Sequence, residues 1–256
     1  EMVVSTPTFS YQDYLDTRVF HLLLTIYHYE GNYEEAFGLA KQYGLRPYDL
    51  IVHLHRILDR APAEFRTVID NFLAESEGEL FHSRQECLDW AKAHYTELAA
   101  GTAGGNLLSK YSMIGRFYTT IPSLDFLQLG IATALAERGL EVDREQLDET
   151  MSYLRAVILR APFGQAMSEV VDMTTRYDIR AWAEDRFQQP LARYVFGAPR
   201  MARAEISPET RALIETKLAT FGEHPSGLGK FTRSMFARDL RRGFVLTNDP
   251  ARRAAS

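Results

Sequence analysis

Cysteine is almost absent from this sequence, and long hydrophobic runs are missing altogether. The single cysteine among 256 residues, Cys87, excludes an internal disulfide framework and any metal site built from several thiolates of this chain. We therefore expect a reducing, cytoplasmic setting. The most apolar stretch, Val19–Tyr27, is interrupted by His21 and is shorter than the roughly 18 residues of a membrane span. No membrane association is predicted.

Signals of secretion are also missing. The chain begins Glu1-Met2-Val3-Val4, with no initiator methionine, no basic n-region and no cleavage site. We expect that an upstream portion has been removed and that Met2-Val3-Val4 is the end of a strand from that portion.

Motifs that carry catalysis or bind metals are not found. There is no nucleophile elbow, and Gly101, Gly104 and Gly105 lack the preceding strand and the Gly-Lys-Ser/Thr ending of a phosphate loop. His53 and His55 are two positions apart, which on a helix turns them about 200° from each other, so they do not suit a shared metal. Cys87, beside Leu88, is predicted to be a packed thiol. No catalytic and no metal-binding residue is predicted.

Helical patterns fill most of what is present. With 46% hydrophobic and 25% charged residues the composition is that of an ordinary globular protein. Capping residues, proline at first turns and 3.6-residue periodicity predict an all-α fold, an irregular bundle of about nine to eleven helices. Helices are expected, for example, at Gln165–Thr175, from Ser83 to Ala99 and, preceded by an Asn32 N-cap, at Tyr33–Tyr43.

The expected organisation has five parts. Residues 1–10 form a residual strand and turn, 11–189 the main helical domain, 190–206 an extended connector with a strand from Arg200 to Ile206, 207–245 C-terminal helices, and 246–256 a disordered tail. The connector is assigned because Pro199 and Gly197 interrupt its apolar residues without a helical period.

Basic residues gather near the C-terminal end. Seven Lys and Arg stand against two Asp between Ser226 and Ser256, a net charge of +5, although the whole chain carries −5. Phosphate contacts need such clusters, but the phenylalanines here have core-like spacing rather than the interleaving typical of base stacking. We expect a solvated face or a docking surface for the rest of the protein, and no nucleic-acid partner.

One segment concentrates residues suited to ligand contact. Residues 104–116 combine glycines, an amide, a lysine, a tyrosine and an arginine near a helix start, which favours anions. The predicted substrate- or ligand-contacting residues are Asn106, Lys110, Tyr111 and Arg116.

The opening of the chain resembles the stretch that follows the catalytic barrel in radical S-adenosylmethionine enzymes with a cobalamin-binding domain. The resemblance is carried by Glu1–Ser10, followed by Asp13 and a helix with Arg18, Phe20, His21 and Leu22, and further on by Gly105–Leu108, Tyr177–Trp182 and Pro190–Tyr194. It covers most of the chain loosely.

The resemblance implies that an upstream part holds a cobalamin domain and a barrel whose cysteine triad binds a [4Fe-4S] cluster and activates S-adenosylmethionine. This chain, with one cysteine, would hold none of these cofactors. It would be a non-catalytic helical C-terminal segment that shapes a substrate pocket or an assembly interface. Its partner would be the upstream barrel of the same chain, and formation of a homo-oligomer is also possible on this interpretation.

Two other interpretations remain. The short helices between Tyr33 and Ala74 also suit a free-standing α-helical interaction module that presents a groove to a partner peptide. A small-molecule sensor using the bundle core is compatible with the number of helices, but no residue supports it.

Overall fold

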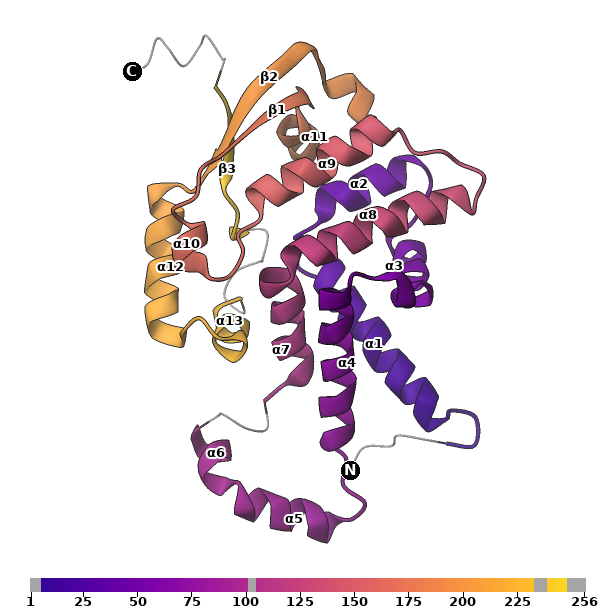
Figure 1. Ribbon diagram of the computed structural model, residues 1–256, viewed down its shortest axis with the longest axis vertical. Helices are drawn as coiled ribbons and strands as arrows, with labels where there is room; N and C mark the ends of the chain where they lie inside the picture. Colours follow the sequence, from indigo (N-terminus) through magenta and orange to yellow (C-terminus); the bar gives the residue numbers. More distant parts are fainter. Residues whose placement is uncertain (1–5, 101–104, 233–238, 248–256) are drawn as a thin grey trace.

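Helices dominate the computed structural model, which describes residues 6–100, 105–232 and 239–247 (Figure 1). These residues form thirteen α-helices and one three-stranded sheet, which confirms the mainly α-helical prediction. The helices outnumber the expected nine to eleven partly because the helix expected from Ser83 to Ala99 divides near His94 into two.

The regular elements described between residues 6 and 157 are all helical. They are α1 (Tyr11–Tyr27), α2 (Glu34–Gln42), α3 (Pro47–Arg56), the 3-10 turn η1 (Leu58–Arg60), α4 (Ala63–Gly78), α5 (Arg84–Ala93), α6 (Tyr95–Ala100), α7 (Leu107–Met113), the π-helical turn η2 (Ile114–Tyr118), α8 (Thr120–Ala136) and α9 (Arg144–Val157).

The C-terminal part mixes strands with short helices. Its elements are α10 (Phe163–Ala166), β1 (Val171–Tyr177), α11 (Ile179–Glu184), the 3-10 turn η3 (Leu191–Tyr194), β2 (Val195–Glu205), α12 (Pro208–Phe221), α13 (Pro225–Phe231) and β3 (Gly243–Leu246).

Several helices begin where a side chain accepts a hydrogen bond from the first turn. The Ser10 hydroxyl accepts from the Asp13 amide at 3.1 Å, and the Asp13 carboxylate accepts from the Ser10 amide at 2.7 Å, a complete capping box. Ser83 caps α5 in the same manner. The expected Asn32 cap is wrong, because α2 starts after Tyr33 and no side chain caps it.

Helix α8 forms the centre of the bundle. It is predominantly apolar and packs against α3, α9, α2 and α4, so most of its residues are buried or half-buried, and Asp125 is exposed. Gly130 allows α3 to approach closely, because a Cβ atom at that position would lie 2.3 Å from Leu54 Cδ2. The hydrophobic core is built around this crossing.

The small antiparallel sheet has the order β1-β2-β3 and lies against α9. Ala202 pairs with Met173 and Leu246, and Ala204 pairs with Phe244. Both alanines are fully buried, and the Tyr153 ring of α9 contacts the Phe244 ring at 4.9 Å. The extended segment expected within 190–206 is thus the central strand of the sheet.

One expected helix is wrong. The segment Gln165–Thr175 leaves the helical conformation after α10 and enters β1, where β-branched side chains are favoured and pair with β2. The end of the region expected to hold the C-terminal helices, residues 243–245, belongs to β3 (Gly243–Leu246). The sheet therefore contains three strands where the sequence predicted one.

Two consecutive arginines join β3 to two different parts of the bundle. Arg241 donates to the Glu35 carboxylate at 2.7 Å and to backbone oxygens of the turn before α2. Arg242 donates to the Ala156 oxygen at 3.0 Å and to Glu169 at 2.7 Å. These two charges of the basic C-terminal end are therefore neutralised inside the fold.

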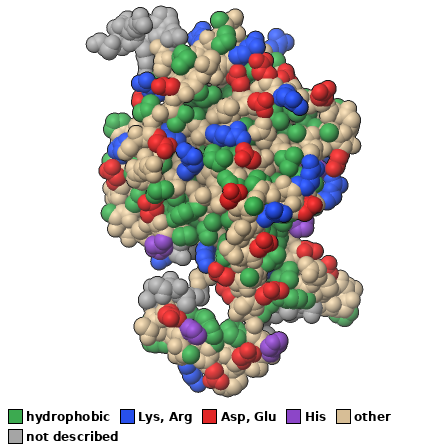
Figure 2. All heavy atoms as spheres, in the orientation of Figure 1, with side chains coloured by type: hydrophobic (Ala, Val, Ile, Leu, Met, Phe, Trp, Pro, Cys, Tyr) green, Lys and Arg blue, Asp and Glu red, His purple; other side chains and the backbone are tan. Residues whose placement is uncertain are grey.

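Helices α5 and α6 project from the body as an arm between α4 and α7 (Figure 1). No residue of α5 is buried, and the space-filling view shows the arm as a separate lobe with hydrophobic side chains on its surface (Figure 2). Leu88 and Tyr95 are exposed. Cys87 is exposed as well, so the prediction of a packed thiol is wrong.

Three predictions fall on residues outside the described ranges. These are the strand-like Met2-Val3-Val4, most of the glycine-containing stretch up to Gly105, and residues 248–256 of the expected tail. The turn before α1 is described, and Thr6 forms an isolated bridge with Phe9.

Candidate functional site

Three of the four predicted ligand residues lie on or immediately before α7. The Asn106 side chain caps that helix by accepting from the Ser109 amide at 3.0 Å. Lys110 Nζ and the Tyr111 hydroxyl both donate to Glu75 on α4, at 2.6 and 2.7 Å. Lys110 and Tyr111 are thus brought together by a carboxylate that sequence reasoning did not single out.

The Glu75 contact has an electrostatic consequence. Partial burial raises the pKa of Glu75, but the hydrogen bonds from Lys110 and Tyr111 outweigh it and lower the pKa below its usual value. A carboxylate that stays ionised beside a lysine neutralises that lysine. The local charge that suggested an anion site is therefore already compensated within the fold.

Arg116, the fourth predicted residue, lies in a different environment. It belongs to the π-helical turn η2 and is fully buried, with Nη1 at 2.6 Å from Glu30 Oε2 and Nη2 donating to the Thr25 oxygen at 2.5 Å. π-Helical turns are rare and are found often at functional sites. The structure thus separates Arg116 from Lys110 and places it in the interior.

A buried polar centre surrounds this arginine. We define it as Glu30, Asn32, Tyr33, Glu35, Arg116 and Arg241. Arg241 pairs with Glu35, whose side chain is 1% exposed, and burial raises the pKa of Tyr33 well above its usual value. The Asn32–Glu35 pattern marked this turn in the sequence, but its contacts with Arg116 and Arg241 come from residues far along the chain.

A larger surface feature lies between α1 and α3. This α1–α3 groove has a volume of about 580 Å³ and is lined by Thr8, Phe9, Asp13, Asp16, Thr17, Phe20, Tyr48, Val52 and His55. The Phe20 ring makes edge-on contacts with Tyr48 at 6.0 Å and His55 at 6.1 Å. The groove therefore combines an aromatic floor with two carboxylates.

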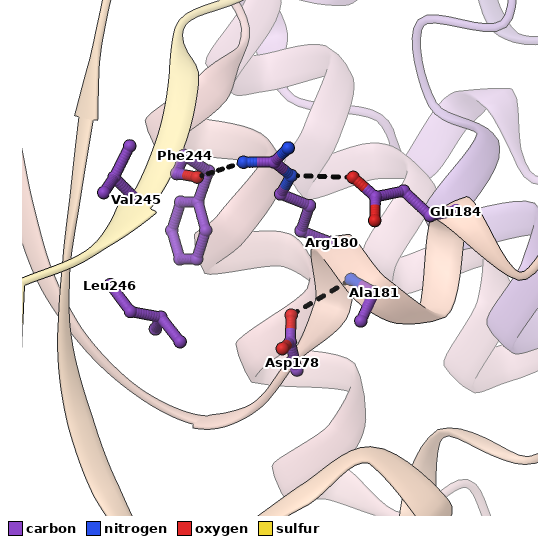
Figure 3. Close-up of a pocket in the computed structure, with 7 residues that line it drawn as sticks. All are labelled: Asp178, Arg180, Ala181, Glu184, Phe244, Val245 and Leu246. Atoms are coloured by element: carbon purple, nitrogen blue, oxygen red, sulfur yellow. Dashed lines mark hydrogen bonds and ion pairs between the residues drawn. The ribbon is translucent and has the colours of Figure 1, made fainter. Parts of the chain in front are cut away.

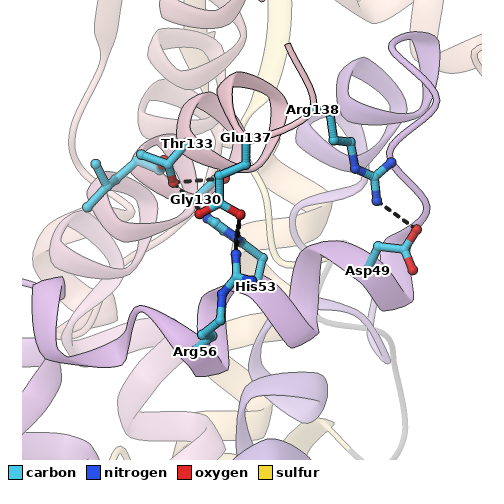
Figure 4. A network of polar contacts seen from close by, with 8 residues as sticks. Asp49, His53, Arg56, Gly130, Thr133, Glu137 and Arg138 are labelled. Carbon is cyan, nitrogen blue, oxygen red and sulfur yellow. Dashed lines mark hydrogen bonds and ion pairs between the residues drawn. The ribbon is translucent and has the colours of Figure 1, made fainter. Parts of the chain in front are cut away.

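Exposed apolar residues on the outer side of α3 also line a second pocket. Tyr48 and Val52, one turn apart, are 63% and 40% exposed, and both also line a pocket of about 320 Å³ between α3 and the end of α8. This pocket contains the polar network drawn in Figure 4. There Arg138 donates to Asp49. Arg46 also donates to Asp49, and the two arginines lower the pKa of Asp49 to about 2.

His53 forms the inner wall of this second pocket. Its Nε2 atom lies 2.7 Å from the Thr133 hydroxyl, and its Nδ1 atom lies 2.8 Å from Arg56 Nη2, which also pairs with Glu137 (Figure 4). Because the arginine can only donate, Nδ1 accepts and the ring is held neutral. Both ring nitrogens of His53 thus have hydrogen-bond partners within the fold, and neither is available to bind a metal together with His55.

We expect His53 to make stability fall at acidic pH. Burial lowers the pKa of His53 below its unfolded value of 6.5, and the nearby charges of Arg56 and Arg60 lower it further. The carboxylate of Glu137 acts in the opposite direction but does not cancel this shift. The unfolded chain therefore takes up the proton first, so the stabilisation is present above about pH 6.5 and is lost as pH falls toward the folded pKa. Melting curves at about pH 7.5 and 5.5 should show a smaller acid-induced loss in His53→Gln than in the wild type.

The exposed His21 provides the control for this measurement. His21→Gln should melt like the wild type at both pH values. Equal acid sensitivity of the wild type and His53→Gln would contradict the prediction.

A third hollow, of about 250 Å³, lies between α11 and β3 (Figure 3). Arg180 crosses it, pairing with Glu184 and donating to the Phe244 oxygen at 3.1 Å, while Asp178 caps α11 through the Ala181 amide. These polar groups connect β3 to α11. They have structural partners, and this hollow is a weaker candidate than the α1–α3 groove.

The described residues offer no ligand set for the [4Fe-4S] cluster that the resemblance implies for the upstream barrel. Among the described residues no three His, Cys, Asp or Glu side chains gather as a metal site, and the one cysteine lies exposed on the arm. A [4Fe-4S] cluster needs several thiolates, so no ligand of such a cluster is assigned here. Within the described ranges, no helix is both long and apolar enough to cross a bilayer.

Comparison with protein-family models, curated proteins and solved structures finds no match to this chain.

Proposed function

We propose that this chain is a non-catalytic helical segment that docks on another protein domain through the α1–α3 groove. The domain we propose is the barrel of a cobalamin-dependent radical S-adenosylmethionine enzyme, acting in the cytoplasm. In that setting the segment shapes the substrate pocket or the assembly interface. The barrel would hold the [4Fe-4S] cluster, S-adenosylmethionine and cobalamin.

The proposal rests on one observation: residues that carry the resemblance also line the α1–α3 groove. The residues on which the resemblance rests at the start of the chain include Phe9, Asp13 and Phe20, and these same residues line the groove. A segment that follows the barrel in sequence would then present its groove next to the junction. This arrangement supports the groove as the contact surface.

The chemistry of the groove favours a basic side chain flanked by apolar ones. Aromatic faces attract cations, and carboxylates at the rim of such a site add charge complementarity. Asp16 is exposed, and it accepts a hydrogen bond only from the neighbouring Gln12 among the contacts of the described residues. The exposed Tyr48 and Val52 extend the apolar surface along α3.

Reversing the charge of the groove should disturb docking without unfolding the chain. In the full-length protein, Asp16→Lys combined with Tyr48→Ala is expected to increase deuterium uptake over Pro47–Arg56 and to reduce turnover severalfold, because a basic partner side chain is repelled and an aromatic contact is lost. Surface substitutions of this kind usually change stability by less than about 0.5 kcal/mol each.

The matched control is Asp70→Lys on the exposed side of α4, which should leave uptake and turnover unchanged. If the groove variant shows the same deuterium uptake and turnover as the wild type, the α1–α3 groove is not the contact surface. The parentage is tested separately: the coding sequence upstream of Glu1 should contain a Cys-x3-Cys-x2-Cys triad, and its absence would refute the radical-enzyme assignment.

The second candidate is a free-standing interaction module. Tyr48 and Val52 are spaced one turn apart on an exposed helix face, which is typical of surfaces that bind a partner helix. A gene of this size, together with one stoichiometric partner whose binding is lost in the same groove variant, would favour the module over the enzyme segment.

A further inference from the structure

Polar atoms without a hydrogen-bond partner concentrate at one place in the interior. Among the residues that the structure describes, nine buried side-chain nitrogen and oxygen atoms lack such a partner, and seven of them belong to the buried polar centre: Glu30 Oε2, Asn32 Nδ2 and Oδ1, Tyr33 Oη, Arg116 Nε and Nη1, and Arg241 Nε. Two of the seven, Glu30 Oε2 and Arg116 Nη1, form an ion pair with each other. Such atoms scattered through the interior would indicate only local packing defects. Their concentration on one turn and two arginines indicates a site that takes a ligand.

The groups of this centre face one another. Tyr33 feels the charges of both Arg116 and Arg241. The Asn32 side chain is near enough to stabilise the ionised Tyr33 hydroxyl, which opposes the effect of burial on the pKa, but the two groups do not have the geometry of a hydrogen bond. Arg116 Nη1 approaches Glu30 to 2.6 Å, although the contact does not have the alignment of a hydrogen bond. Asn32, Tyr33 and Arg116 are each at most 1% exposed.

We propose that ordered water binds in the buried polar centre, between Tyr33, Asn32 and Arg116. Two guanidinium groups are balanced there by the carboxylates of Glu30 and Glu35, so the centre favours neither an anion nor a cation. It presents both donors and acceptors, and a buried water molecule typically makes about three hydrogen bonds of both kinds. Water is the small neutral ligand that satisfies both.

The site has a role in joining elements distant in sequence. Glu30, Asn32 and Tyr33 lie in the turn between α1 and α2, Arg116 comes from the π-helical turn, and Arg241 lies two residues before β3. Water bound among them would connect this turn to the middle and the end of the chain. The π-helical geometry of η2 places Arg116 in this position.

The test compares two tyrosines that are both buried and lie 5.4 Å apart between ring centroids. Tyr27 donates directly to the Ser123 oxygen at 3.0 Å, whereas among the described residues the Tyr33 hydroxyl has no partner with hydrogen-bond geometry, although the Asn32 side chain is near it. Oxygen-17 magnetic relaxation dispersion of the intact chain should report long-lived internal water. We expect this signal to decrease in Tyr33→Phe and to remain at the wild-type level in Tyr27→Phe.

Thermal melting gives a second readout, and both variants should lower Tm by similar amounts. If Tyr33 were unpaired in a dry site, removing its hydroxyl would leave Tm unchanged or raise it, and that outcome overturns the proposal. An unchanged dispersion signal in Tyr33→Phe overturns it whatever the melting result. If Tyr33→Phe does not fold, a high-resolution crystal structure of the wild type decides, because density for water within hydrogen-bond distance of Tyr33 Oη is required.

Discussion

Replacing Arg241 with methionine is expected to lower the free energy of unfolding by about 3–5 kcal/mol. The substitution leaves the Glu35 carboxylate, 1% exposed, without the guanidinium that pairs with it through two hydrogen bonds at 2.7 and 3.1 Å. Breaking a buried ion pair from one side is costly because the remaining charge cannot be solvated. Urea denaturation of the wild type and the variant measures the difference.

Two comparisons make this measurement specific. Arg203→Met removes the exposed partner of Asp172 and should cost less than about 1 kcal/mol. Adding Glu35→Leu to Arg241→Met should recover part of the loss, since the unpaired charge is removed as well. Equal destabilisation by Arg203→Met and Arg241→Met would show that the burial of Glu35 does not determine the effect.

Phe65→Ala is the second substitution with a large expected effect, a loss of about 3–5 kcal/mol in the free energy of unfolding. The Phe65 ring is fully buried between Tyr27 at 6.0 Å and Phe126 at 5.7 Å, so it joins α4 to α1 and α8. Alanine removes these contacts and leaves a cavity that rigid helices fill only in part.

An aromatic residue on the arm provides the control for Phe65. Tyr95 is 72% exposed, and Tyr95→Ala should change the free energy of unfolding by no more than about 0.5 kcal/mol. Denaturant midpoints with unchanged slopes would confirm both values. A loss below about 1 kcal/mol for Phe65→Ala would contradict the central position of its ring in the core.

The helices with local signals could be predicted, and the strands were mostly missed. Ser10 with Asp13 and Ser83 with Glu86 determine helix starts within three residues, so the sequence contains the whole signal. β1 and β3 depend instead on pairing with β2, and β3 is separated from it by two helices. A four-residue strand such as Gly243–Leu246 has too little pattern to be found without its partner.

The candidate sites show the same limit. Lys110, Tyr111 and Arg116 were selected for their residue types, but the carboxylates beside them, Glu75 and Glu30, lie 35 and 86 positions away. The α1–α3 groove combines residues from the opening turn and two helices. Side chains brought together by helix packing leave no spacing rule in the sequence, so the groove could not be predicted.

The consecutive arginines that follow the last helices also bear on how the protein is made. Synthesis proceeds from the N-terminus, so Glu35 and the turn before α2 leave the ribosome long before Arg241 and Arg242 exist. Until then the early helices contain a carboxylate whose partner has not been translated. We therefore expect the native packing around Glu35 to be completed only after Arg241 and Arg242 have emerged, so the early helices wait for a late part of the chain.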